Sequence, residues 1–138
     1  MFAGSIEFVK NNGETITMRS VWWGGDRIIH LAAKEPPAGT LSTHIGYSIG
    51  HWDDGSLVVK TTRVDWPYFD RDGTPQSDKV EFVERFTMTD DESRLNYILT
   101  ASDPIMFTGP IIVTNAFDWR PGSEIKAGDC VLWDDATQ

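Results

Sequence analysis

The sequence predicts an all-β protein folded as an antiparallel barrel of about eight strands. Runs rich in β-branched and aromatic residues alternate with turns that contain Gly, Asn and Asp. No segment keeps helical periodicity over three turns. Such strands must bury their apolar faces on one another, and closing the sheet protects its edges. A closed or nearly closed barrel is therefore favoured, with a β-sandwich as the alternative.

The strands are expected at regular intervals along the chain. They cover residues 5–10, 14–22, 27–32, 46–52, 56–64, 79–89, 94–102 and 111–119. Four turn signals separate them, at 11–13 (NNG), 23–26 (WGGD), 53–55 (DDG) and 90–93 (DDES). Short turns of this kind join antiparallel neighbours, which predicts an up-and-down barrel of the lipocalin or streptavidin type. The Pro-rich stretch 34–39 is expected to be a long surface connection.

Length and composition limit the partners and the location. A chain of 138 residues with 40% hydrophobic and 12% aromatic content suits one domain, 1–138. The net charge of -9, with basic residues scattered among acids, disfavours a nucleic-acid partner and an anionic membrane. No stretch approaches the roughly 20 apolar residues of a membrane span, and the first residues lack the features of a signal peptide, so a cytoplasmic location is expected.

Cysteine and histidine usage argues against a metal centre. Cys130 is the only cysteine, so no disulfide can form within the chain. The three histidines, His30, His44 and His51, do not have the spacing of metal ligands on one element. The stretch 70–73 (DRDG) begins like a calcium loop but lacks the later acidic ligands. We expect no metal site and no cofactor.

The strand 79–89 carries the most informative residue. Alternation places Glu84 on the same face as Val80, Phe82, Phe86 and Met88. A carboxylate on the core side of a strand costs several kcal/mol unless a partner or water satisfies it. Glu84 is therefore the candidate catalytic residue.

Neighbouring strands are expected to surround Glu84 with polar and aromatic groups. The inward positions predicted for them are Leu57, Val59, Thr61, Arg63, Leu95, Tyr97, Leu99, Ala101, Ile111, Val113, Asn115, Phe117 and Trp119. The candidate ligand-binding residues are Arg63, Tyr97, Asn115, Phe82, Phe86, Trp119, Trp66 and His51. Arg63 is the expected partner of Glu84, because the adjacent Arg85 alternates to the opposite face. A polar cluster in an aromatic cavity suits a small-molecule site, and a Glu-Arg pair that only holds strands in register is equally compatible.

Two further patterns have a structural and a functional interpretation. The stretch 46–50 (GYSIG) matches the hydrolase pattern G-x-S-x-G, but that motif requires a strand, a turn and a helix, so Ser48 is not expected to be a nucleophile. Its glycines are expected to allow a bend or a close strand contact. The stretch 66–69 (WPYF) is either a lid over a cavity or an aromatic cluster that covers the barrel end or a subunit contact.

Several motifs together resemble those of a group of uncharacterised bacterial proteins. They are GYSIGHW (46–52), LVVKTT (57–62), DWPYFD (65–70), GTPQS (73–77), VERFT (83–87), DP (103–104) and WRPG (119–122). The resemblance implies that Trp52, Asp65, Trp66, Asp70, Glu84 and Arg85 occupy positions of the group's pattern, and that relatives can carry secretion signals. Where those relatives often have G-R-W-E-G-D, this chain has GHWDDG (50–55), so no role of that arginine transfers to His51.

Three functional hypotheses follow from these residues. The favoured one is a barrel that binds a small, partly apolar molecule. The second is a small acid/base enzyme, an isomerase, lyase or cyclase, with Glu84 as general base and Tyr97 or His51 as the donor to an oxyanion. The third is an assembly protein with a filled barrel, in which the aromatic connection and the tail 131–133 (VLW) contact a second copy.

Overall fold

The computed structural model describes residues 5–20 and 26–123, and all eight expected runs form strands in it. They are β1 (Ile6–Lys10), β2 (Thr15–Ser20), β3 (Arg27–His30), β4 (Tyr47–Asp53), β5 (Ser56–Thr62), β6 (Glu81–Met88), β7 (Arg94–Ser102) and β8 (Ile111–Asp118). Most of the turn at 23–26, Cys130 and the tail at 131–133 lie outside the described residues. The all-β, barrel-like class is confirmed.

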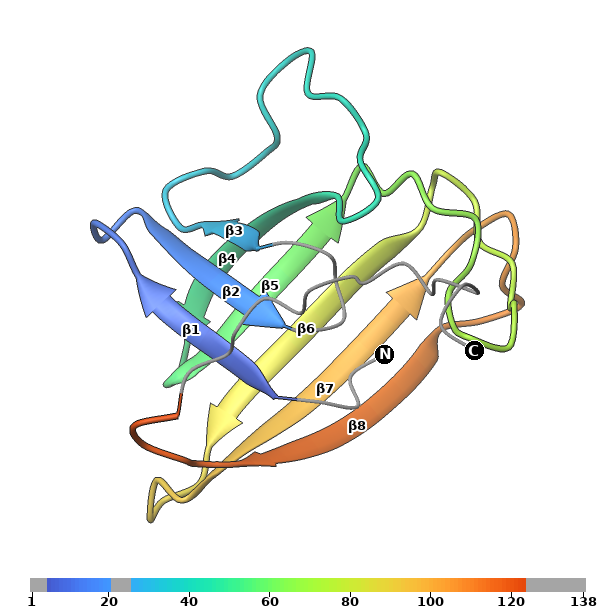
Figure 1. Ribbon diagram of the computed structural model, residues 1–138. Coiled ribbons are helices and arrows are strands. Elements are labelled where there is room, and N and C mark those ends of the chain that lie inside the picture. The colour runs from blue at the N-terminus through green and yellow to red at the C-terminus, as the bar shows by residue number, and fades with distance from the viewer. Residues whose placement is uncertain (1–4, 21–25, 124–138) are drawn as a thin grey trace, which may run out of the picture.

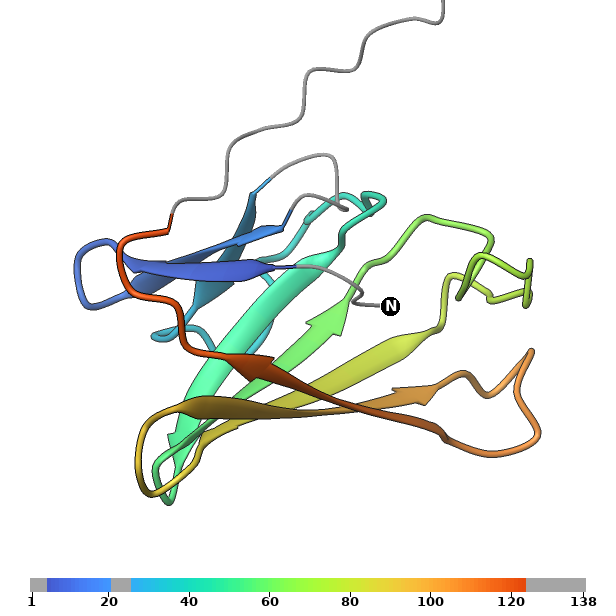
Figure 2. The ribbon, with the colours of Figure 1, turned by 60° about the horizontal axis from the view of Figure 1, so that its bottom comes forward.

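The strands form one sheet in the order β1 to β8, which curls through 234° into a half-barrel (Figure 1, Figure 2). A single curled sheet replaces the two-sheet sandwich that the sequence left as the alternative. The expectation that all neighbours are antiparallel was wrong at one place, because β3 and β4 pair in parallel, with Ile29 opposite Ser48. Residues 31–46 connect them, and parallel neighbours need such a long crossover, since the chain must return to the end from which it started.

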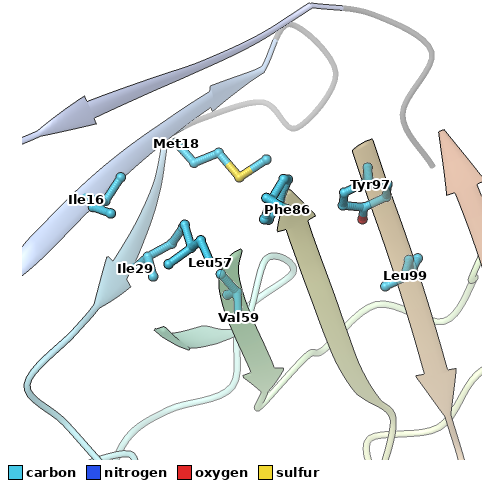
Figure 3. Packing of buried hydrophobic residues seen from close by; sticks show 8 residues of the cluster. All are labelled: Ile16, Met18, Ile29, Leu57, Val59, Phe86, Tyr97 and Leu99. Carbon is cyan, nitrogen blue, oxygen red and sulfur yellow. The ribbon is translucent and has the colours of Figure 1, made fainter. Parts of the chain in front are cut away.

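The core lies on the concave face of this sheet. Its buried members come from five strands, β2, β3, β5, β6 and β7, and are Ile16, Met18, Ile29, Leu57, Val59, Phe86, Tyr97 and Leu99 (Figure 3). Phe8 of β1 reaches across the half-barrel to Phe86 of β6, with ring centroids 5.1 Å apart in an edge-to-face arrangement. This contact brings the first strand onto the middle of the sheet and fills the space between them.

The aromatic connection between β5 and β6 divides into a packed and an exposed part. Phe69 packs against Phe82 of β6 and Phe107, with centroid distances of 6.3 and 5.8 Å. Trp66 and Tyr68 remain exposed. Phe69 therefore covers the core as the cluster interpretation expected, while the two neighbouring rings face outward.

Candidate functional site

The structure places Glu84 in a buried ion pair with Arg27, and the prediction of Arg63 as its partner was wrong. Glu84 Oε1 accepts a hydrogen bond from Arg27 Nη2 at 2.6 Å, and Oε2 accepts one from Arg27 Nη1 at 3.2 Å. Both side chains are buried, at 2% and 7% exposure. Arg63 instead follows β5 as an exposed residue with a positive φ of 59°, because the chain turns there instead of continuing the strand.

The ion pair belongs to a polar band that takes one residue from each of five consecutive strands. Arg27 Nη2 also donates to Ser48 Oγ and Thr61 Oγ1, both at 3.2 Å, and these two hydroxyls lie 2.8 Å apart. The Tyr97 hydroxyl donates to Glu84 Oε2 at 2.9 Å. All five side chains are buried. The band therefore ties β3 to β7 with charge-assisted hydrogen bonds, which are stronger than neutral ones.

The electrostatics of the band keep Tyr97 protonated. Burial raises the pKa of the Tyr97 phenol well above its usual range, and the charge of Glu84 and the hydrogen bond to it act in the same direction. Tyr97 is thus a fixed donor to the carboxylate. Because Glu84 is buried and accepts three hydrogen bonds on its two oxygens, its geometry is that of a structural partner for Arg27.

Ser48 is part of the band, which gives the GYSIG stretch a structural role. Its hydroxyl bonds to Arg27 and Thr61. The expected close strand contacts of the glycines are confirmed, because an added Cβ would lie 2.5 Å from Thr62 O at Gly46 and 2.6 Å from Ile29 Cγ2 at Gly50.

The predicted ligand-binding residues divide into two groups. Phe82, Phe86, Tyr97 and Asn115 share the concave face: the rings of Phe86 and Tyr97 lie 5.0 Å apart, and Asn115 lies directly opposite Tyr97 on β8. Asn115 is exposed there, since β8 is the last strand of the half-barrel.

The other predicted residues are not brought together with Glu84. His51 is exposed and alternates with the inward Gly50, so it faces outward. Trp66 is 54% exposed in the connection, and Trp119 is 66% exposed just after β8. The adjacent Arg85 does alternate away from Glu84, as expected, and forms an ion pair with Asp53.

Sequence reasoning missed Arg27 and Ser48 as members of the band, and it placed Thr61 correctly on the inward face but gave it no polar role. Arg27 lies two residues before the fully buried Ile29, so alternation along β3 places it on the core face. That signal was available, but β3 has only four residues and its alternation is short.

The concave face also carries an apolar surface that is only partly covered. Trp52 lies opposite the buried Leu57, and Met88 lies opposite Leu95, which in turn lies opposite Phe117. Directly opposed residues share a face, so these side chains all point to the concave side. Yet Trp52 is 62% and Met88 42% exposed. We call Trp52, Met88, Leu95 and Phe117 the hairpin-end surface, because it lies toward the β4–β5 and β6–β7 hairpins (Figure 1).

In two acidic turns outside this surface, an aspartate carboxylate accepts hydrogen bonds from nearby residues of its own turn. A surface groove of about 620 Å³ at the β6–β7 turn is lined by Thr89, Asp90, Asp91, Ser93, Arg94 and Asp118. Hydrogen bonds from the hydroxyls of Thr89 and Ser93 and from the Ser93 N–H lower the pKa of Asp91 to about 2. Asp70 likewise accepts from Asp72 N, Thr74 N and the Thr74 hydroxyl.

Residues 5–20 and 26–123 contain neither a cluster of metal-binding side chains nor a membrane-spanning helix. No group of three or more His, Cys, Asp or Glu side chains is placed to hold a metal ion in that part of the chain. It also contains no helix with the length and apolar character needed to cross a bilayer. The chain matches no family model, no curated protein and no solved structure.

Proposed function

We propose that this protein binds a small, partly apolar molecule on the hairpin-end surface of its half-barrel. One observation carries the proposal: Trp52 and Met88 point to the core side of the sheet but are 62% and 42% exposed. On the same strands and the same face, Ser48 is 2% and Phe86 is 3% exposed. A concentration of exposed apolar side chains on a concave face is typical of a binding site.

Covering this surface contributes favourable free energy to binding. A buried aromatic side chain removes about 150–250 Å² from water, and Trp52 and Met88 are 62% and 42% exposed, so covering them withdraws at least about 150 Å². At about 25 cal/mol per Å² this is a gross gain of about 4 kcal/mol, which offsets about the lower limit of the cost of association, so the net affinity comes from the ligand's own buried apolar surface and from a polar contact. The proposed ligand therefore has an apolar body of about one or two rings.

Asn115 is the proposed polar contact at this site. It lies on the concave face of β8, between Val113 and Phe117, and it is exposed. A single amide beside an apolar surface fixes the orientation of a ligand without charge. Since the chain carries a net charge of -9, a neutral ligand such as a phenol or ketone suits it better than an anion.

The acid/base enzyme hypothesis is not favoured by the geometry. A general base must bring a lone pair within hydrogen-bond reach of a substrate proton. Glu84 is 2% exposed and accepts hydrogen bonds from Arg27 and Tyr97 on both oxygens. We therefore assign Glu84 to stability and the hairpin-end surface to binding.

Thermal unfolding in the presence of small molecules tests the proposal. The panel contains neutral phenols, ketones, apolar acids and lipids, and a ligand at 100 times its dissociation constant adds about 2.7 kcal/mol to stability. We expect a phenol or ketone to raise the unfolding temperature of the wild type. Trp52→Ala should remove this increase, and Trp66→Ala, which truncates a ring that is 54% exposed elsewhere, should keep it. An increase lost in Trp66→Ala but kept in Trp52→Ala would refute the assignment.

A further inference from the structure

The outer edge of β8 is exposed and lacks the features that protect natural sheet edges. β8 is the last strand of the order, and among residues 5–20 and 26–123 no strand pairs with its outer side. It has eight residues, of which Ile111 to Phe117 are uncharged and include neither Pro nor Lys. Charges, proline, bulges or shortness normally protect such an edge. The other edge strand, β1, has five residues and carries Glu7 and Lys10.

We propose that two copies of this chain associate through β8, with the two strands antiparallel about a twofold axis at Thr114. Each sheet would then continue into the other, and the unpaired backbone groups of the two edges would bond to one another. An isologous contact of this kind uses the same strand on both copies, so its two halves must be self-complementary.

The side chains of β8 select this register. Thr114 lies opposite Thr114 of the partner subunit, and Ile112 lies opposite Ala116 of the partner subunit. All of these side chains point outward, so residues of the same face are paired. A shift by one residue would place the outward Ile112 against the inward Phe117, which the period of the strand forbids. A shift by two toward the end of β8 would place the 65% exposed Ile112 against the carboxylate of Asp118. A shift by two toward its start would place Ala116 against Pro110, which has no N–H to donate.

The uncharged edge of β8 suits a second copy of itself better than a charged edge would. Each chain carries a net charge of -9, so two copies repel one another at long range, and a contact free of acids adds no further repulsion at short range. In the proposed register every opposed pair from Ile111 to Phe117 is uncharged. Asp118 falls beyond the paired stretch and already bonds to Arg94 at 3.1 Å.

One contact limits the strength of the association. The N–H of Ala116 donates to Asn115 Oδ1 at 2.8 Å, so this backbone donor already has a partner that strand pairing would have to replace. We therefore expect a reversible dimer whose population depends on protein concentration.

Sedimentation equilibrium over a range of concentrations tests the dimer. The wild type should approach twice the chain mass of 15.5 kDa. Thr114→Lys, which adds a charge at the axis, should weaken the dimer at least tenfold. The matched control Val83→Lys adds the same charge on the outward face of β6, two strands from the edge, and should leave the dimer unchanged. A monomer at all concentrations, oligomers larger than a dimer, or a dimer lost only in Val83→Lys would overturn the proposal.

Disulfide trapping tests the register in variants that also carry Cys130→Ser. Directly opposed Cα atoms lie about 4.5 or 5.5 Å apart in an antiparallel pair, within the roughly 4.4–6.8 Å that a disulfide spans. Thr114→Cys should therefore form a covalent dimer on mild oxidation. Ala116→Cys should not, because its two copies would lie four residues apart along the strand, about 14 Å. Cross-linking of Ala116→Cys without cross-linking of Thr114→Cys would overturn the register.

Discussion

Breaking the buried Arg27–Glu84 pair should cost a large part of the stability of this protein. In Glu84→Gln the side chain keeps its shape but loses its charge, and the guanidinium of Arg27 remains at 7% exposure without a counter-charge. When the amide NH₂ replaces Oε2, the NH₂ faces the donor Arg27 Nη1 at 3.2 Å, although the Tyr97 hydroxyl at 2.9 Å can rotate to accept from it. When the NH₂ replaces Oε1, it faces the donor Arg27 Nη2 at 2.6 Å. Either orientation places the NH₂ against an N–H of the Arg27 guanidinium.

The expected loss is about 3–5 kcal/mol, the usual consequence of removing one member of a buried ion pair. Domains of this size have total stabilities of about 5–15 kcal/mol. The variant should therefore still fold in water but unfold at a much lower denaturant concentration. Urea unfolding followed by tryptophan fluorescence and circular dichroism measures this loss.

The double variant Arg27→Met/Glu84→Gln provides the control. Without the arginine no buried charge remains in the polar band, and the glutamine carbonyl can still accept from Tyr97. We expect the double variant to be more stable than the sum of the single losses predicts, with a coupling energy of about 2–3 kcal/mol. A loss below about 1 kcal/mol in Glu84→Gln, together with additive losses in the double variant, would refute the structural role of the pair.

Three further predictions concern other contacts of the fold. Gly50→Ala should cost about 1–3 kcal/mol in urea unfolding, because its Cβ would lie 2.6 Å from Ile29 Cγ2, whereas Gly109→Ala, with nothing within 4 Å, should change stability by less than about 0.5 kcal/mol; equal effects would contradict the close contact. Tyr97→Phe removes a hydrogen bond to a carboxylate and should cost about 1.5–3 kcal/mol by the same assay; an unchanged midpoint would exclude that bond. Burial raises the pKa of Asp103, but hydrogen bonds from Ser77, Ile105 and Met106 outweigh it and hold the pKa below its usual range. Stability from Asp103 should therefore be present above the unfolded value of 3.8 and be lost as the pH falls through the lower folded value, so Asp103→Asn should lose less stability on acidification than the wild type; parallel pH profiles would contradict this.

The strands were predictable because each alternates over several residues between clear turns. In β7, Leu95, Tyr97 and Leu99 were expected on one face, and they contribute to the core. The hairpin turn at 53–55 likewise joins the antiparallel strands β4 and β5. At these places the alternation of the strands and the turn residues predict the same structure, so the sequence is sufficient to predict the strands and their pairing.

Pairing between distant segments was harder to predict. The parallel contact of β3 with β4 depends on the path of residues 31–46, for which no short turn sets the direction. The partner of Glu84 depends on the same path, because Arg27 lies on β3 while Arg63 lies much nearer in sequence. Alternation predicts the face of the sheet on which a charged side chain lies. Its contact partner depends on how the sheet curls and cannot be predicted from alternation alone.

The exposed residues of the concave face could not be predicted for a related reason. Asn115 was expected inside a closed barrel, and its face was predicted correctly. The half-barrel leaves that face open beside β8 and toward the hairpins, and closure is a property of the whole sheet. Alternation therefore identifies Trp52 and Met88 as inward but gives no measure of their exposure.

The indole N–H resonances of the six tryptophans provide the most direct test of the hairpin-end surface as a binding site. Each resonance is assigned with a single Trp→Phe variant, and the ¹⁵N-labelled wild type is titrated with 2-naphthol, a neutral phenol with two rings. We expect a saturable shift of the Trp52 resonance, while that of Trp66 stays in place. A titration that moves Trp66 and leaves Trp52 unchanged, or one that moves neither, would contradict the proposed site.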